Sequence, residues 1–258
     1  MTAYTSFHLS LLDKIIVVAN TCKRRLRYLY NIDADKISVV YNGIDPMRLV
    51  SDKTRSAMRD ALGVGFGVKV ISMIGRLVPQ KGYRYAFRAI RELLKYRDDF
   101  VVHIAGVGRE LPMLDEYAIE LGIRDKIKFL AYREDVPDLL QATDIFLNTS
   151  IHEGLPYTVQ EAMFWGVPVV ASPVDGTPEA VADGRTGFLV EYDDPLGIAL
   201  RLKTLMEHPE ICFSMGQAAM TRAHDMFTIS EMIDKTEGIY RQRRHVRDSV
   251  PDSLPVSG

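Results

Sequence analysis

Cysteine is scarce in this 258-residue chain, and long apolar segments are absent from its sequence. The two cysteines, Cys22 and Cys212, stand alone, with no CxxC pair and no histidine at ligand spacing. The sequence therefore indicates neither a zinc site nor a disulfide framework. No apolar stretch is long enough to span a bilayer, and residues 1–6 lack the charged start and apolar core of a signal peptide. We expect a cytoplasmic protein in a reducing compartment.

A large excess of charge of either sign is also missing. The formal net charge is -2, with 26% charged and 47% hydrophobic residues, which is typical of a soluble globular protein. A net charge so close to zero argues against nucleic-acid binding driven by overall charge. The length allows one large domain, or a medium domain with appendages, and gives ample capacity to bury a core.

Residues 148–162 form the stretch around which we expect the chain to be organised. Ile145–Leu147 is a short apolar run suited to a buried parallel strand, and Gly154 permits a sharp reversal after it. Pro156 fits the first position of a helix, where its missing N–H would have no partner. The pattern thus predicts a strand, a tight loop and a helix that runs to about Trp165.

The predicted start of this helix carries the first chemical signal. Unpaired N–H groups and the positive end of the helix dipole at 154–156 make a site for a phosphate or another anion. Glu153 and Glu161 bracket the site and lie at most about 12 Å apart if the residues between them are helical, at about 1.5 Å each. That arrangement suits a diphosphate with a sugar at one end and a ribose at the other. Alternatively, both are ordinary surface glutamates, which are common.

A second loop supplies cations. Gly75 and Arg76 follow the predicted strand Lys69–Ile74, and Lys81 lies in the same loop. An arginine forks onto phosphate oxygens and a lysine supplies a point charge, so together they can hold a leaving diphosphate while negative charge builds on it. The alternative is a solvated basic loop.

The two motifs read Gly-Arg-x4-Lys-Gly at 75–82 and Glu-Gly-Leu-Pro-x4-Glu-Ala at 153–162. Together they resemble retaining glycosyltransferases of the two-domain GT-B type, in the group 1 or family 4 class, and the resemblance covers roughly residues 13–240. It implies an α/β fold: a Rossmann-like, doubly wound parallel sheet that forms one GT-B half, with a partial remnant of the N-terminal domain. It also implies a nucleoside-diphosphate sugar, such as a UDP- or GDP-hexose, as donor, and neither a metal nor a cofactor.

Site residues follow from the resemblance, position by position. Arg76 and Lys81 would contact the diphosphate, and Glu161 would bind the ribose hydroxyls. Glu153 would lie by the transferred sugar, while the N–H groups of Gly154 and Leu155 would face the distal phosphate or the sugar. The catalytic candidates are Glu153, Arg76 and Lys81, and the donor-binding candidates are Gly75, Arg76, Lys81, Arg133, Val136, Glu153, Gly154, Leu155 and Glu161.

The domain organisation implied by the resemblance is incomplete. Residues 1–45 resemble only the end of the acceptor-binding domain and its linker, so nearly all of that domain is missing here. A donor domain is expected over 46–228 and a helix that crosses back to the N-terminal domain over 229–244. The tail 245–258, rich in proline and small polar residues, is expected to be disordered.

The loop that would meet the nucleobase departs from the family pattern. It follows the predicted strand Lys126–Leu130, and Ala131 stands where the family usually has glycine. Arg133 and Val136 are candidates for contact with the base, and the alternative is that both are plain loop residues.

Four further residues invite functional readings that we weigh against structural ones. Gly106 and Gly108 form only a partial glycine signature, which would let the backbone approach the nucleotide. His103 is expected to be a satisfied core histidine rather than a base. Thr177 is expected to cap the short helix that it precedes.

Three functions compete at this stage. The first is a hexosyltransferase that passes the sugar to an acceptor hydroxyl of a glycan, a lipid or a small molecule, with retention of configuration. The second is a donor-binding subunit that works only with a separate acceptor-domain chain, or a relative without turnover. An epimerase or hydrolase is the third, which the two motifs disfavour. The basic segment 23–27 would allow peripheral membrane contact, although a solvated helix face is the favoured interpretation.

Overall fold

The computed structural model describes residues 8, 9 and 11–248, with side chains up to residue 241. The strands are β1 Ile15–Val17, β2 Ile37–Val39, β3 Lys69–Ile74, β4 Phe100–Ala105, β5 Ile127–Phe129, β6 Ile145–Asn148, β7 Val169–Ala171 and β8 Gly187–Leu189. The α-helices are α2 Asn20–Tyr30, α3 Arg55–Ala61, α4 Tyr83–Leu93, α5 Leu111–Glu120, α6 Val136–Ala142, α7 Tyr157–Phe164, α8 Thr177–Ala180, α9 Pro195–Glu207, α10 Pro209–Met226 and α11 Ile229–Asp248.

Within the described residues, six parallel strands form the main sheet in the order β5-β4-β3-β6-β7-β8. The sheet begins at its centre with β3 and grows outward through β4 and β5. The chain then returns to the other side of β3 and continues through β6, β7 and β8. Strand order therefore reverses between β3 and β6, which is where open α/β sheets leave a crevice outside the carboxyl ends of the strands. The predicted doubly wound parallel sheet is confirmed.

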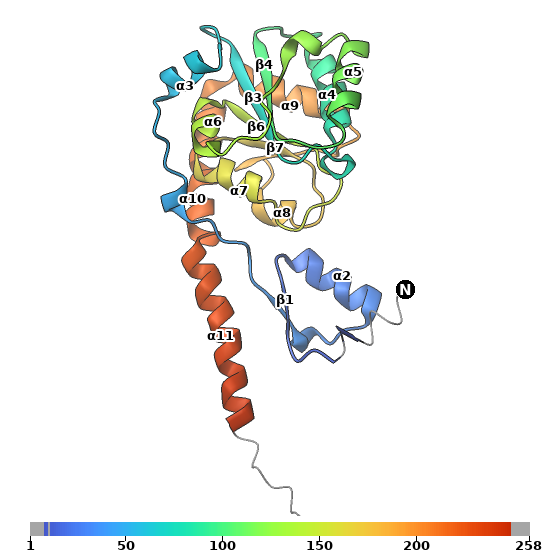
Figure 1. Cartoon of the computed structure of the whole chain (residues 1–258), viewed down its shortest axis with the longest axis vertical. Coiled ribbons are helices and arrows are strands. Elements are labelled where there is room, and N and C mark those ends of the chain that lie inside the picture. Colours follow the sequence, from blue (N-terminus) through green and yellow to red (C-terminus); the bar gives the residue numbers. More distant parts are fainter. Residues whose placement is uncertain (1–7, 10, 249–258) are drawn as a thin grey trace, which may run out of the picture.

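Helices cover both faces of this sheet (Figure 1). On one face α4 packs against α9 and α5, and on the other α7 packs against α10 and α6. Helix α4 shows why the sequence folds this way: Ala86, Phe87, Ile90 and Leu93 recur at helical spacing, and all four are fully buried.

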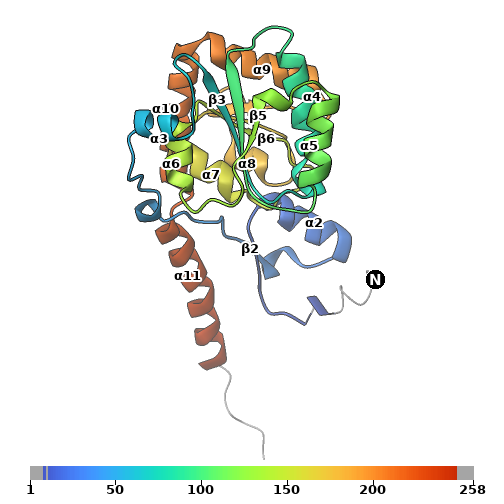
Figure 2. The same cartoon turned by 45° about the horizontal axis from the view of Figure 1, so that its top comes forward.

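A small unit made of β1, α2 and β2 lies below the main sheet, next to α8 (Figures 1 and 2). Glu179 attaches it: its carboxylate accepts hydrogen bonds from the backbone N–H groups of Asn20 and Thr21, both at 2.8 Å. Burial alone raises the pKa of Glu179, but the hydrogen bonds from Asn20 and Thr21 outweigh it, so the net pKa is lowered. Glu179 thus provides the carboxylate at the positive end of α2.

The predicted cap of α8 is wrong. Gly176 occupies the N-cap position, and Thr177 is the first helical residue. The hydroxyl of Thr177 is buried without a hydrogen-bond partner among the described residues. Glycine is required at position 176 because its backbone lies against the loop after β6: a Cβ there would lie 2.0 Å from the carbonyl oxygen of Gly154.

Helix α11 leaves the main body at the linker (Figure 1). Its start is fixed by two backbone hydrogen bonds, from Ile44 N–H to the Phe227 carbonyl at 2.7 Å and from Ile229 N–H to the Ile44 carbonyl at 2.9 Å. The helix runs to Asp248, beyond the predicted end at 244 and into the segment expected to be disordered. Residues 249–258 of that segment lie outside the described residues. In the part of the chain that the structure describes, no helix combines the length and apolar character needed to cross a membrane.

His103 lies in the core on β4, as predicted, and is 2% exposed. Its Nε2 atom has no hydrogen-bond partner among the described residues, so the expectation that its hydrogen bonds are satisfied is wrong at this atom. Burial, with smaller contributions from Lys128 and Arg59, lowers the pKa of His103 to about 4. The ring is therefore neutral at pH 7, which makes burial without a charged partner tolerable.

Candidate functional site

The loops that follow β3 and β6 are joined directly at the carboxyl edge of the sheet. The N–H of Ile151 donates to the carbonyl of Gln80 at 2.9 Å, and the side-chain amide of Gln80 donates to the carbonyl of His152 at 2.9 Å. The hydroxyl of Thr149 donates to the carbonyl of Gly82 at 3.0 Å. The loop with the predicted cations and the loop with the predicted acids therefore form one surface at the point where strand order reverses.

Lys81 and Glu153 meet on this surface. The Nζ atom of Lys81 lies 2.5 Å from Oε1 of Glu153, and the hydroxyl of Ser150 donates to the same oxygen at 2.7 Å. The Lys81 side chain is 20% exposed and the Glu153 side chain is 9% exposed. The two predicted site residues are thus brought into contact. Because both charges are largely removed from water, loss of either one would leave the other poorly compensated.

Arg76 lies on the same loop but is exposed, and its guanidinium group has no ion-pair or hydrogen-bond partner among the described residues. Gly75, before it, has a φ of +156°, and its carbonyl accepts a hydrogen bond from the Tyr83 hydroxyl at 2.9 Å. The hydroxyl of Tyr83 therefore fixes the backbone at Gly75, while the guanidinium of Arg76 is free to bind an anion.

The start of α7 differs by one residue from the prediction. Pro156 is the N-cap, with extended backbone angles, and Tyr157 is the first helical residue. The missing N–H of Pro156 is tolerated at the N-cap because the first N–H groups of a helix have no intrahelical partner. In the part of the chain that the structure describes, the N–H groups of Gly154 and Leu155 donate no hydrogen bond. They remain available as the anion-binding groups that the sequence predicted.

Asp175 is a residue of this site that the sequence reasoning missed. Its carboxylate accepts a hydrogen bond from the N–H of Glu153 at 2.9 Å and lies 3.6 Å from Nδ1 of His152. Its φ is +44°, a left-handed conformation that aspartate tolerates better than most residues. The signal was the Asp-Gly pair after β7, since this pair marks a tight turn.

Glu161 lines a separate cavity of about 500 Å³, which we call the Glu161 cavity. Val136 and Tyr157 line it too, together with residues of the segment between β2 and α3 that include Asp45 and Arg48. Burial raises the pKa of Glu161 to about 7. The carboxyl group is therefore poised between its protonated and ionised forms at neutral pH.

The two candidates for base contact are separated by the structure. Val136 is at the start of α6 and lines the Glu161 cavity. Arg133 is instead held by a nearby acid, with its Nε atom 2.7 Å from Oδ1 of Asp135. This hydrogen bond, opposed by partial burial, raises the pKa of the Arg133 guanidinium.

Gly106 and Gly108 are explained by loop packing. A Cβ at Gly106 would lie 1.9 Å from the carbonyl oxygen of Gly75, and one at Gly108 would lie 2.2 Å from that of Leu77. The N–H of Leu77 also donates to the carbonyl of Val107 at 2.9 Å. The glycines let the loop after β4 support the loop after β3, which is a structural reason for their presence.

Ala131 has a φ of +56°, the left-handed region that costs a residue with a Cβ roughly 1–2 kcal/mol. The glycine that the resemblance places at this position would adopt it freely. We expect Ala131→Gly to raise the free energy of unfolding by about 0.5–1 kcal/mol after the added entropy of the unfolded chain is subtracted. Ala57→Gly, in the exposed part of α3, should lower it. Urea unfolding measures the free energy of unfolding of both variants. If Ala131→Gly lowered it as much as Ala57→Gly does, the left-handed conformation of Ala131 would be contradicted.

Comparison with known protein families gives two matches along the chain. The family described as Glycosyl transferases group 1 matches residues 55–222, and Glycosyltransferase Family 4 matches residues 2–48. The D-inositol 3-phosphate glycosyltransferase of Corynebacterium efficiens is 35% identical over 228 residues, which make up 83% of this chain and 54% of that protein. The chain therefore spans about half the length of the curated relatives it matches.

Solved structures share the fold. A glycosyltransferase from Rickettsia africae superposes with a TM-score of 0.85 at 23% identity, covering 94% of this chain and 67% of that one. The Anabaena protein HepE, in complex with UDP and glucose, gives a TM-score of 0.83 at 24% identity, covering 89% and 63%. These likenesses confirm the predicted fold class, one half of a GT-B fold with part of the other. From the family match and the Corynebacterium relative it follows that the chain belongs to the group 1 glycosyl transferases.

Proposed function

We propose that this chain binds a nucleoside-diphosphate hexose and supplies the donor side of a transfer of the hexose to an acceptor hydroxyl, with retention of configuration. The observation that carries the proposal is the contact between Lys81 and Glu153, which joins the two loops where strand order reverses. Membership of the group 1 family supports sugar transfer as the reaction class.

The diphosphate end of the site has positive groups on two sides. Transfer breaks the bond between the anomeric carbon and a diphosphate oxygen, whose electron pair stays on the diphosphate, and forms a bond from that carbon to the acceptor oxygen. The proton of the acceptor hydroxyl passes to the departing diphosphate oxygen. Arg76, Lys81 and the free N–H groups at 154–155 would stabilise the charge that builds on the leaving group. Lys81 would exchange Glu153 for the diphosphate, which frees the Glu153 carboxylate to accept hydrogen bonds from sugar hydroxyls.

The nucleoside end is assigned to the Glu161 cavity. Its size, about 500 Å³, falls within the range of small-molecule sites. An ionised Glu161 would accept hydrogen bonds from the two ribose hydroxyls, while Val136 and Tyr157 offer apolar surface to the base. UDP is the probe we choose, because HepE, which shares the fold, was solved with UDP and glucose.

Glu161 predicts a pH dependence. Its folded-state pKa of about 7 stands above the ordinary 4.5, so the stability contributed by the protonated form is complete below about pH 4.5 and is lost as pH rises through 7. Ribose hydroxyls favour the ionised form, and the diphosphate of UDP-glucose does not titrate in this range. Affinity for UDP-glucose should therefore rise by up to about tenfold from pH 6 to pH 8, as the ionised fraction rises. Calorimetry at pH 6 to 8 on the unaltered protein and on Glu161→Gln tests this. If the affinity of the variant for UDP-glucose rose with pH as steeply as that of the unaltered protein, the role of Glu161 would be contradicted.

Turnover is tested by incubating the chain with UDP-glucose, with and without candidate acceptors such as inositol 3-phosphate, and measuring released UDP and labelled product. The proposal predicts donor-dependent UDP release that Arg76→Ala reduces. Saturable donor binding without any release, even when chains carrying an acceptor domain are added, would contradict transfer and leave a binding protein. Absence of nucleotide binding would contradict the donor site itself.

A further inference from the structure

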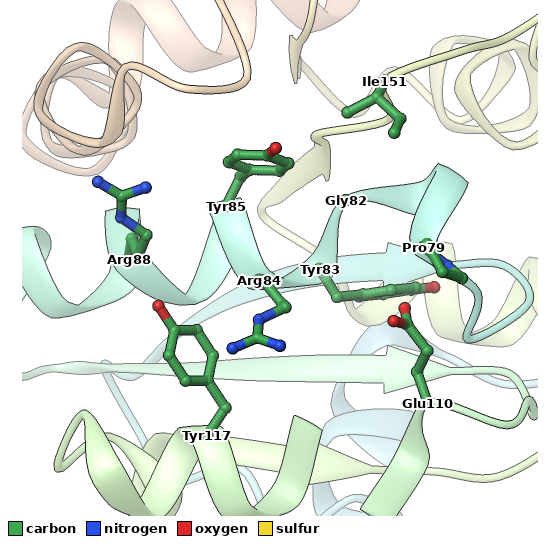
Figure 3. A pocket seen from close by; sticks show the side chains of 9 residues that line it. All are labelled: Pro79, Gly82, Tyr83, Arg84, Tyr85, Arg88, Glu110, Tyr117 and Ile151. Atoms are coloured by element: carbon green, nitrogen blue, oxygen red, sulfur yellow. The ribbon is translucent and has the colours of Figure 1, made fainter. Parts of the chain in front are cut away.

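A second cavity, which we call the Glu110 cavity, lies between the start of α4 and α5 and has a volume of about 290 Å³ (Figure 3). Pro79 and Gly82 form its wall on the side of the loop after β3, and Ile151 closes it from the loop after β6. None of the predicted donor-binding residues lines it. It is therefore distinct from the site assigned to the nucleotide sugar.

The Glu110 cavity contains a buried acid that the fold does not use. Glu110 is 8% exposed, and among the described residues no group donates a hydrogen bond to its carboxylate. It occupies the N-cap position of α5 without a side-chain cap, and Figure 3 shows it reaching from the start of α5 toward Tyr83. Its oxygens are not among the fully buried atoms without a partner, so they are accessible from the cavity, where the hydroxyl groups of a ligand can donate hydrogen bonds to them.

Two arginines face the same cavity without acidic partners. Arg84 and Arg88 line it one helical turn apart on α4 and are both exposed, and within the described part of the chain neither guanidinium group forms an ion pair or a hydrogen bond. The guanidinium carbon of Arg84 lies 4.4 Å from the ring centroid of Tyr117, a cation–π contact. With Glu110 the charged lining adds up to +1, which favours an anionic ligand.

Aromatic rings complete the lining. Tyr83, Tyr85 and Tyr117 all border the cavity, and Tyr85 is held edge-on by Tyr192 at a centroid distance of 4.8 Å. Rigid rings beside a few polar groups bind ligands that have an apolar face and a polar rim. A pyranose ring has both, and a volume of about 290 Å³ suits a single such ring.

We propose that the Glu110 cavity is a second, non-catalytic binding site for an anionic monosaccharide, a pyranose that carries one carboxylate or phosphate group. Glu110 accepts hydrogen bonds from its hydroxyls, Arg84 and Arg88 bind its anionic group, and the tyrosine rings pack against its apolar face. The assignment does not depend on the donor site, since none of the predicted donor-binding residues lines the Glu110 cavity.

The test is calorimetry on the full chain with glucuronate and glucose 6-phosphate, which distinguish the two anionic groups, and with glucose and inorganic phosphate as partial probes. UDP is present at saturation, so that donor-site binding is blocked and its affinity is measured separately. At least one anionic sugar should bind with a Kd of about 1 mM or lower and at least tenfold more tightly than either partial probe. UDP affinity should be unchanged in every variant named below.

Three variants locate the binding. The double variant Arg84→Ala, Arg88→Ala should weaken binding of the anionic sugar at least tenfold. Glu110→Gln should weaken binding of the sugar but should not weaken binding of phosphate, since the variant removes a negative charge from the cavity. Arg91→Ala is the matched control, because Arg91 is exposed on the same helix but does not line the cavity. Phosphate that binds as tightly as the sugars, binding that the double variant leaves intact, or no saturation by any probe below about 10 mM would each overturn the proposal.

Discussion

A Lys81→Ala variant is expected to bind UDP about 10- to 100-fold more weakly than the unaltered protein, because a charge-assisted contact to the diphosphate contributes about 1.5–3 kcal/mol. Uridine, which lacks the diphosphate, should lose less than about twofold. Calorimetric titration with UDP and uridine separates the two contributions. Lys95→Ala is the matched control: it also removes a lysine with an acidic partner, Glu92, but this lysine is exposed and lies just beyond the end of α4.

The loss of Lys81 also affects stability, and this effect must be separated from binding. Glu153, with a side chain only 9% exposed, would be left without its cation. The double variant Lys81→Ala, Glu153→Gln removes the stranded charge, so the free energy of unfolding should recover while UDP affinity stays low. Equal losses for UDP and uridine, or full recovery of UDP affinity in the double variant, would contradict the role of Lys81 in binding the diphosphate.

Gly82→Ala should have the largest effect on stability. Gly82 has a φ of +65°, and a Cβ there would lie 2.0 Å from the carbonyl oxygen of Thr149. The loops after β3 and β6 would have to separate, which breaks the hydrogen bond from the Thr149 hydroxyl to the Gly82 carbonyl. We expect a loss of about 4 kcal/mol or more, the range reached when a buried contact is disrupted. Thermal or urea unfolding measures it.

Gly122→Ala provides the matched control for that experiment. Gly122 also has a φ of +65°, but a Cβ there would meet no atom within 4 Å. Gly122→Ala should therefore lower the free energy of unfolding only by the cost of the left-handed backbone conformation, about 1–2 kcal/mol. If the two alanine variants lost equal stability, the close approach of the two loops would be disproved.

The positions of the strands could be predicted because they depend on local patterns. The bounds of β3 agree with the prediction at both ends, since it is a largely apolar run that ends at a glycine. Two predicted helix starts, at Pro156 and Thr177, differ from the structure by one residue. The position of a helix cap depends on contacts with other loops, which the local sequence does not reveal. At Thr177 the deciding neighbour is the carbonyl of Gly154, which is remote in sequence.

The contacts within the site could be predicted only in part. The sequence placed Lys81 and Glu153 at the same edge of the sheet because parallel strands end together, but it did not predict that they would touch each other. It also gave no sign that Glu161 would be buried enough to raise its pKa to about 7, since burial depends on the linker that covers α7. Asp175 was missed because its role is a contact to a backbone N–H from another loop.

The central claim is that the loops after β3 and β6 bind one diphosphate between them. The most direct measurement is the change in backbone amide chemical shifts when isotope-labelled protein is titrated with UDP. We predict saturable changes that are largest at residues 75–82 and 153–156, including Gly154 and Leu155. Changes confined to other parts of the molecule, or no saturable change at either loop, would contradict the claim.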